Sequence, residues 1–469
     1  MKSKPFVRAR AALVASLCAA ALSPTTHADS AKVDNALHEQ ALEILRKSVG
    51  FRTVAGAGQV PAYGEYLKGV LVAAGFAPED IRIEPVGTTA LLIARYRGTD
   101  STKKPIVING HMDVVEARPQ DWERDPFVAV VENGYVFGRG SVDNKFDVSM
   151  VTATLAHLKR SGWKPRRDVV LALSGDEETE MASTRKLARE LKDAELVLND
   201  DSGGGLLSED GKPIIYGIQA AEKVYADFTL TVTDAGGHSS RPGKANAIYQ
   251  LARALERIER YEFPAMQNEI TRAYFQASAA TAAPPIADAM RRFVADPKDA
   301  QAIATLSADR EYIGQVRTTC VATEIQGGHA PNALPQRATA NVNCRIFPGT
   351  SVASVQQTLT GVINDPGVQI SVQPGSVEGD PSPLRPDVMA AVTKAVHASY
   401  PNVAIVPNMS AGATDSMHFR ALGIPSYGVS GLFMKPTDDF THGLNERVPV
   451  AAIDVALTHW DTLLRALAR

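Results

Sequence analysis

Three short apolar segments in the first half of the chain each run directly into acidic or histidine residues. The apolar segments and the polar residues that follow them are 106–108 with 109–113, 169–173 with 174–178, and 196–198 with 199–201. Short apolar runs separated by helical periodicity are typical of buried strands in a parallel sheet. The carboxyl ends of such strands line one crevice at the edge of the sheet. The sequence therefore predicts an α/β fold with acidic and histidine side chains gathered at one edge.

The pattern changes at about residue 223 and returns to α/β style after residue 374. The segment between them reads as a strand, a helix, two strands, a helix and a strand, which is the order of a ferredoxin-like unit. An alanine-rich, helical insertion at 264–312 interrupts it. We therefore expect a catalytic domain with a mostly parallel central sheet and an inserted ferredoxin-like α+β domain that serves as a lid or dimerisation domain. The predicted boundaries are 29–222 with 374–469 for the catalytic domain and 223–373 for the inserted domain.

The first 28 residues have the order of a secretory signal peptide. Four basic residues precede an apolar run at 11–22, and small residues precede a cleavage point after Ala28. The run of about 12 apolar residues is too short to cross a bilayer, which needs about 20. We therefore expect an exported protein, periplasmic or secreted, with no membrane anchor after cleavage.

The mature chain would keep two cysteines, Cys320 and Cys344. They lie symmetrically about Asn332, as facing positions of an antiparallel hairpin would. In an oxidising compartment they form either a disulfide or two buried thiols, and the sequence leaves both open.

Charge and motif content exclude several classes of protein. The chain of 469 residues has 49 basic and 52 acidic residues, so it has no basic excess for binding nucleic acid. Residues 138–140 begin like a dinucleotide loop, but Asp143 replaces the third glycine and no strand is expected directly before them. Residues 428–431 begin like a nucleophile elbow, but Leu432 replaces the closing glycine.

The acidic crevice itself indicates bound metal ions. Buried carboxylates repel one another and take up protons unless cations are present. Imidazole and carboxylate donors without thiolates suit zinc, with cobalt or manganese as possible substitutes. About five ligands point to two ions, about 3.5 to 4 Å apart, that share a bridging carboxylate and activate a water. The expected reaction is hydrolysis.

Several segments together resemble one family of enzymes. These segments are 111–113, 125–127, 138–145, 176–178, 236–239, 332–335 and 441–446, in this order. They are similar to the zinc-dependent exopeptidase and aminoacylase family, which includes glutamate carboxypeptidase, carnosine dipeptidase and succinyl-diaminopimelate desuccinylase. The resemblance covers essentially the whole mature chain.

The resemblance implies a set of metal ligands. One zinc would be held by His111, Asp143 and an aspartate at position 200 or 201, and the other by Asp143, Glu178 and His442. Asp143 would bridge the two ions. Many relatives have a single glutamate where this chain has two aspartates, and we favour Asp201 because it adjoins the glycine-rich stretch. In similar proteins an aspartate here goes with peptidases acting on dipeptides or free N-termini, and a glutamate with carboxypeptidases and aminoacylases.

The resemblance also implies roles around the metals. Glu177 would be the general base, and Asp113 would orient the imidazole of His111. A histidine of the inserted domain, His238, would stabilise the oxyanion, often from the partner subunit. The substrate would be held by Asn332, Arg345, Gly412 and Thr414. A homodimer formed through the inserted domain is possible, although the insertion at 264–312 could block it.

These observations predict an exported di-zinc metallopeptidase of the exopeptidase or dipeptidase type that cleaves small peptides. The alternative is an aminoacylase that hydrolyses N-acyl amino acids at the same site. A non-catalytic peptide-binding protein would be expected to lack the base or the bridging ligand, but Glu177 and Asp143 are both present.

Overall fold

The computed structural model describes residues 33–469. The predicted signal peptide, residues 1–28, lies outside the described residues. Within residues 33–469, none of the helices combines the length and the apolar character needed to cross a membrane.

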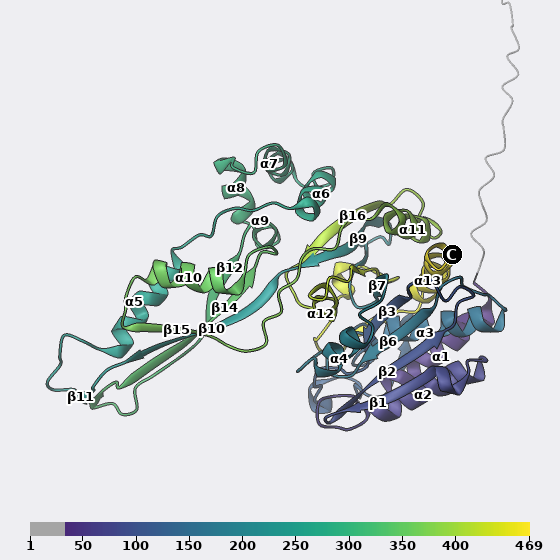
Figure 1. Cartoon of the computed structure of the whole chain (residues 1–469), viewed down its shortest axis with the longest axis horizontal. Coiled ribbons are helices and arrows are strands. Elements are labelled where there is room, and N and C mark those ends of the chain that lie inside the picture. The colour runs from purple at the N-terminus through teal and green to yellow at the C-terminus, as the bar shows by residue number, and fades with distance from the viewer. Residues whose placement is uncertain (1–32) are drawn as a thin grey trace, which may run out of the picture. The chain divides into compact units, whose positions relative to one another are not determined.

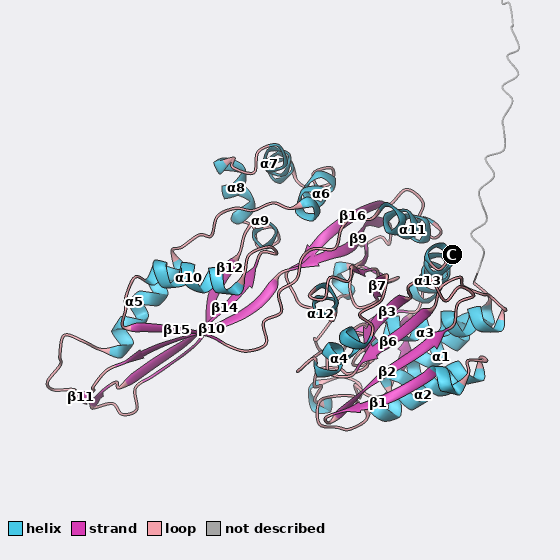
Figure 2. Ribbon diagram, viewed as in Figure 1, coloured by secondary structure: helices cyan, strands magenta, loops and turns pink. Residues whose placement is uncertain are grey.

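The larger sheet has ten strands among the described residues (Figures 1 and 2). In spatial order they are β1 (Ile81–Val86), β2 (Thr89–Tyr96), β6 (Val169–Ser174), β3 (Ile106–His111), β7 (Leu196–Asn199), β17 (Ser426–Gly428), β9 (Pro213–Glu222), β8 (Gly204–Leu207) and β18 (Phe433–Met434), with β16 (Ala404–Ser410) also paired to β9. The central strands β6, β3, β7 and β17 run parallel to one another. This confirms the predicted α/β fold with a mostly parallel central sheet.

Helices cover both faces of this sheet (Figure 2). One face carries α1 (Asn35–Val49), α2 (Val60–Ala73), α3 (Lys145–Arg160), α11 (Pro386–His397) and α13 (Ala452–Leu467), and the other carries α4 (Ala182–Glu190) and α12 (Ser416–Arg420). Successive side chains of a strand point to opposite faces. Accordingly, Ile106 and Ile108 join the core on the first face, whereas Val107 joins the core on the second. Burial on both faces explains why these strands are continuous apolar runs.

A second sheet, here called the small sheet, has the ferredoxin-like order β12-β14-β10-β15 in the described part of the chain. Its elements are β10 (Val224–Thr233), α5 (Ala247–Glu259), β12 (Thr319–Gly327), β14 (Arg337–Ile346), α10 (Val352–Ile363) and β15 (Val368–Val372). All of its strand pairs are antiparallel, and the two helices share one core with it. A short pair, β11 (Gly237–His238) with β13 (Ala333–Leu334), extends from it.

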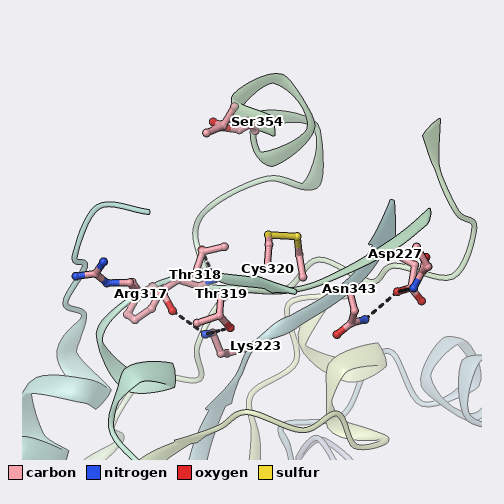
Figure 3. The surroundings of a disulfide bond; sticks show 12 residues. Lys223, Asp227, Arg317, Thr318, Thr319, Cys320, Asn343 and Ser354 are labelled. Carbon is pink, nitrogen blue, oxygen red and sulfur yellow. Dashed lines mark hydrogen bonds between the residues drawn. A yellow bond between two sulfur atoms is a disulfide. The ribbon is translucent and has the colours of Figure 1, made fainter. Parts of the chain in front are cut away.

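The two cysteines form a disulfide across the small sheet. Cys320 on β12 lies opposite Cys344 on β14, with 4.1 Å between their Cα atoms (Figure 3). Nearby, Asn343 donates a hydrogen bond of 2.9 Å to Asp227 on β10. Of the two states left open by the sequence, the structure has the disulfide.

The insertion predicted at 264–312 is helical. It contains α6 (Glu269–Ser278), α7 (Pro284–Ala295) and α8 (Ala300–Ser307), and α9 (Ile313–Val316) follows directly after it. Phe275, Met290 and Phe293 form a core of its own. Ile270 on α6 joins the core of the larger sheet instead, so α6 packs against β16.

We propose the domain boundaries predicted from the sequence. In support, the larger sheet's β9 ends at Glu222, and the small sheet's β10 begins at Val224. The last strand of the small sheet ends at Val372, before the larger sheet resumes with β16.

One sequence-based expectation was wrong. A three-residue strand, β5 (Tyr135–Phe137), directly precedes Gly138, where no strand was expected. It forms a hairpin with β4 (Val130–Glu132) through Asn133 and Gly134, which both have positive φ. Asn-Gly is the favoured sequence for such a two-residue turn, so the signal was present but overlooked. On its other side β5 pairs with β19 (Arg447–Pro449).

Removing the disulfide should destabilise the small sheet. We expect Cys320→Ala combined with Cys344→Ala to lower the free energy of unfolding by about 3 kcal/mol, because the cross-link closes a loop with a sequence separation of 24. Chemical denaturation of the variant and the oxidised wild type would measure this. Equal midpoints would contradict the expectation.

Candidate metal centre

Three strand ends of the larger sheet bring predicted metal ligands and the predicted base to one place. His111 is the last residue of β3, Glu177 and Glu178 follow β6, and Asp201 follows β7. The parallel register sets His111 beside Ser174 on β6. The strand ends therefore adjoin, as the sequence predicted.

Two loops distant in sequence complete the cluster. Asp143 lies between β5 and α3, and His442 lies shortly before β19. Because β5 pairs with β19, Phe137 lies opposite Arg447, and Gly138 donates a backbone hydrogen bond of 3.0 Å to the carbonyl of Glu446. This pairing brings Asp143 and His442 to the same edge.

The side chains form two triads that share Asp143. One triad is His111, Asp143 and Asp201, and the other is Asp143, Glu178 and His442; in each, the ligand atoms lie within 4.8 Å of one another. Asp143 Oδ1 is 2.9 Å from His111 Nε2, and its Oδ2 is 3.1 Å from His442 Nε2. Each oxygen of one carboxylate thus faces a different imidazole, which is the arrangement of a bridging ligand.

The structure separates the two consecutive aspartates. Asp201 Oδ1 lies 3.5 Å from His111 Nε2. Asp200 is fully buried and lies against Gly110, where a Cβ atom would come within 2.1 Å of its Oδ1. Asp201, and not Asp200, therefore lies beside the imidazole of His111, and its assignment as a metal ligand stays a prediction.

Asp113 holds the segment that carries the candidate base. Its two carboxylate oxygens accept hydrogen bonds from the backbone N–H groups of Glu177 and Glu178, at 3.1 and 3.0 Å. Its Oδ1 also lies 3.5 Å from His111 Nδ1, on the ring edge opposite the cluster. Glu177 is buried and forms a third group with His111 and Glu178, whose ligand atoms also lie within 4.8 Å of one another but which does not include Asp143.

Burial and mutual charge govern protonation in the cluster. Burial raises the pKa of Glu177 well above its usual range and that of Asp201 to about 7. Hydrogen bonds to Asp143 and Glu178 raise the pKa of His442 to about 10. Burial alone would raise the pKa of Asp143, but hydrogen bonds with the two histidines hold it below its usual range.

The donor set fits two divalent cations. Without cations, protons on the imidazoles and on buried carboxylates balance the negative charge, and cations can replace these protons. The ligands are imidazoles and carboxylates with no thiolate, which suits zinc and also permits manganese or cobalt.

A buried ion pair, not singled out by the sequence, joins the two ligand loops. Arg139 donates to Glu446 Oε2 at 2.5 Å and to the carbonyl oxygens of His442 and Gly443. Glu446 also accepts from the backbone N–H of Val142, at 2.8 Å, and from that of Asp143, at 3.2 Å. The pair therefore fixes both loops, and only the family motif around Glu446 could have drawn attention to it.

Asp415 is a second residue that sequence reasoning did not assign. It is buried and accepts hydrogen bonds from Ser174 at 2.6 Å and Asn109 at 3.2 Å, and also from Thr184. It thereby links β6, β3 and α4 directly behind the cluster. No local pattern distinguishes it from other aspartates.

The remaining predicted residues lie outside the metal-binding groups of the described chain. His238 and Asn332 are both exposed, and they are near each other because Ser239 donates to the carbonyl of Asn332. Arg345 donates to the carbonyl of Ala411 at 3.0 Å.

The predicted loop residues after β16 have local partners. The backbone N–H of Gly412 donates to the Ser410 hydroxyl at 3.0 Å. Thr414 is buried, and its N–H and hydroxyl both donate to Glu222. Their assignment to the substrate remains a prediction.

Replacing Glu446 should weaken metal binding without removing a ligand. We expect Glu446→Gln to lower metal affinity about 10- to 100-fold, because the amide leaves Arg139 without its buried counter-charge and frees the Asp143 loop. Competition with a chromophoric chelator would measure the affinity. The control is Glu65→Gln, at an exposed position on α2. A folded Glu446→Gln variant that binds metal as the control does would refute this role.

Metal affinity should rise with pH. Asp201 has a pKa of about 7, so below that pH it holds a proton that a cation must displace. His442 has a pKa of about 10 and therefore holds a proton at neutral pH. Each proton released steepens the dependence by about tenfold per pH unit. Titrations between about pH 6 and pH 8 would test this, and an affinity independent of pH would argue against proton displacement.

The chain matches known proteins in sequence. The sequence model of "Peptidase family M20/M25/M40" matches residues 107–466. N-fatty-acyl-amino acid synthase/hydrolase PM20D1 of Xenopus tropicalis is 30% identical over 447 residues, which cover 91% of this chain and 86% of that relative.

Solved structures share the fold. The M20 family metallo-carboxypeptidase Sso-CP2 from Sulfolobus solfataricus has a TM-score of 0.70 at 20% identity, over 92% of this chain and 99% of that chain. The YXEP protein of Bacillus subtilis, a dinuclear metal binding peptidase from the M20 family, has a TM-score of 0.58 at 16% identity, over 92% of this chain and 98% of that chain. The resemblance identified from the sequence is confirmed, and the chain belongs to peptidase family M20/M25/M40, a family of metal-dependent hydrolases.

Proposed function

We propose that this protein hydrolyses an amide bond at a centre of two zinc ions. The observation that carries the proposal is the position of Asp143 between two imidazoles, with Asp201 completing one triad and Glu178 the other. When bound, two divalent cations would polarise the scissile carbonyl and make an attacking water more acidic.

Glu177 is the general base in this proposal. It belongs to neither of the triads that share Asp143, although it lies in a third group of ligand atoms with His111 and Glu178. In this proposal its carboxylate takes a proton from water and returns it to the leaving nitrogen. Burial raises its pKa, which strengthens it as a proton acceptor. Asp113 positions Glu177, because its carboxylate accepts a hydrogen bond from the backbone N–H of Glu177.

The substrate class we propose is N-acyl amino acids. In support, the relative named above as an N-fatty-acyl-amino acid synthase/hydrolase is 30% identical over 91% of this chain. This choice reverses the order of the two activities expected from the sequence. Peptides remain the second candidate, because Asp201 stands where a glutamate would favour aminoacylases.

Export and dimerisation are further parts of the proposal. The disulfide between Cys320 and Cys344 supports a periplasmic or secreted protein, because such bonds persist in oxidising compartments. At the edge of the small sheet, β12 exposes Val321 and Ile325, which supports a homodimer through this domain. His238 would then stabilise the oxyanion in the partner's site, and Asn332, Arg345, Gly412 and Thr414 would hold the substrate.

Removal of the base should abolish turnover but spare the metal site. We expect Glu177→Gln to lower kcat about 10²- to 10⁴-fold, because the amide cannot accept the proton. Metal content should equal that of the wild type, since both triads that share Asp143 keep all their ligands; Glu177 belongs only to the group with His111 and Glu178. Hydrolysis rates and elemental analysis on the same preparations would test this, and a variant with wild-type kcat would remove Glu177 from the mechanism.

The substrate class would be tested in the same assays. The metal-loaded wild type is offered matched N-acyl amino acids and dipeptides, with a chelated sample as the control. Hydrolysis of the N-acyl compounds that is lost on chelation and restored by zinc supports the proposal. Hydrolysis of dipeptides but not of N-acyl amino acids would contradict this substrate class and support a peptidase.

A further inference from the structure

A cavity of about 400 Å³ opens beside the metal centre. Asp143, Asp201 and Thr441 line its inner end, next to the triads. Its outer walls come from β8, β9 and β18 at the edge of the larger sheet. Its volume lies in the range of pockets that enclose small organic ligands.

The outer wall is a row of apolar side chains on neighbouring strands. Leu206 on β8 lies opposite Ile215 on β9 and opposite Met434 on β18, and all three line the cavity. Residues paired in this way have side chains on the same face of a sheet. Leu206 keeps 37% of its surface exposed, so its side chain is open to a ligand in the cavity.

Glycines keep the rest of the cavity open. Gly203 and Gly204 line it, and both have positive φ. A Cβ atom would lie 2.3 Å from the carbonyl oxygen of Gly428 at the first position and 2.8 Å from that of Leu432 at the second. Neither position can carry a side chain, so the backbone forms this wall.

The lining of the cavity offers no cationic side chain to a carboxylate of the substrate. Bound cations would neutralise Asp143 and Asp201, but Asp147 and Asp200 also line the cavity, and the lining contains no lysine, arginine or histidine of the described chain. A carboxylate would therefore find no cationic partner among these side chains, whereas an alkyl chain can lie against the apolar row.

The base sets the direction of the substrate relative to this cavity. The leaving nitrogen must lie near Glu177 to receive its proton. Glu177 does not line the cavity. The other group on the carbonyl carbon is the acyl chain, and the cavity beside Asp143 and Asp201 is where it can extend.

We propose that this cavity binds the acyl chain of the substrate and that Leu206, Ile215 and Met434 set the preference for long chains. This inference rests on the proposed hydrolysis of N-acyl amino acids. Each buried methylene stabilises a complex by about 0.8 kcal/mol, or about fourfold in affinity. The preference should therefore rise with chain length until the cavity is full.

The test compares N-acetyl, N-hexanoyl and N-dodecanoyl derivatives of one amino acid, with metal-loaded enzyme. We expect kcat/KM of the wild type to increase along the series. Leu206→Ser should lower kcat/KM roughly tenfold for the dodecanoyl compound and leave the acetyl compound unchanged. The control is Ile214→Ser. Ile214 is 39% exposed and lies on the same β8–β9 hairpin, but it does not line the cavity. It should match the wild type throughout.

A binding measurement separates the cavity from turnover. Calorimetric titration of the metal-loaded protein with hexanoate and dodecanoate, whose carboxylates the cations would hold, should give tighter binding for the longer chain, and Leu206→Ser should remove that difference. A wild type that hydrolyses the acetyl compound with no dependence on chain length would overturn the acyl cavity but not the proposed function. Equal losses for Leu206→Ser and Ile214→Ser would also overturn the cavity. Failure to hydrolyse any N-acyl compound would overturn both.

Discussion

The rest of the site depends on the carboxylate of Asp143. One of its oxygens faces His111 at the end of a central strand, and the other faces His442 in a loop near the C-terminus. A displacement that shortens one of these contacts lengthens the other, so the position of this carboxylate is narrowly defined. Both triads share it, and two cations could be held close together only while it stays in place.

The fold meets this constraint with buried polar contacts rather than with a rigid strand. Asp143 lies in a loop, and the Arg139–Glu446 pair fixes that loop to the one carrying His442. A buried ion pair carries a large desolvation cost. Here the carboxylate of Glu446 accepts several hydrogen bonds from backbone N–H groups as well as from the guanidinium, so its lone pairs are satisfied. The main effect of the ion pair is therefore to fix the positions of the two loops and not to stabilise the fold.

The sequence was informative where a local pattern determines structure. The apolar runs ending at His111 and before Glu177 predicted strands of one parallel sheet and side chains at one edge. Asp143 and His442 have no such pattern, because β5 and β19 create their proximity over a long stretch of chain; only the family resemblance pointed to them. The contacts of Asp415 depend on three elements at once and were not predictable from any one of them.

The metal centre and the acyl cavity are built by different parts of the larger sheet. Residues that carry out the reaction and residues that select the substrate therefore lie on different strands. The central strands are buried on both faces, so a residue at a strand end, such as His111, is held by cores that tolerate little change. The apolar row of Leu206, Ile215 and Met434 lies on β8, β9 and β18, toward one edge of the sheet, where these side chains are partly exposed. Substitutions there can alter the group bound on the acyl side without moving a metal ligand. Relatives that share the same metal centre can therefore differ in substrate, because the residues that carry out the reaction and those that select the substrate lie on different elements.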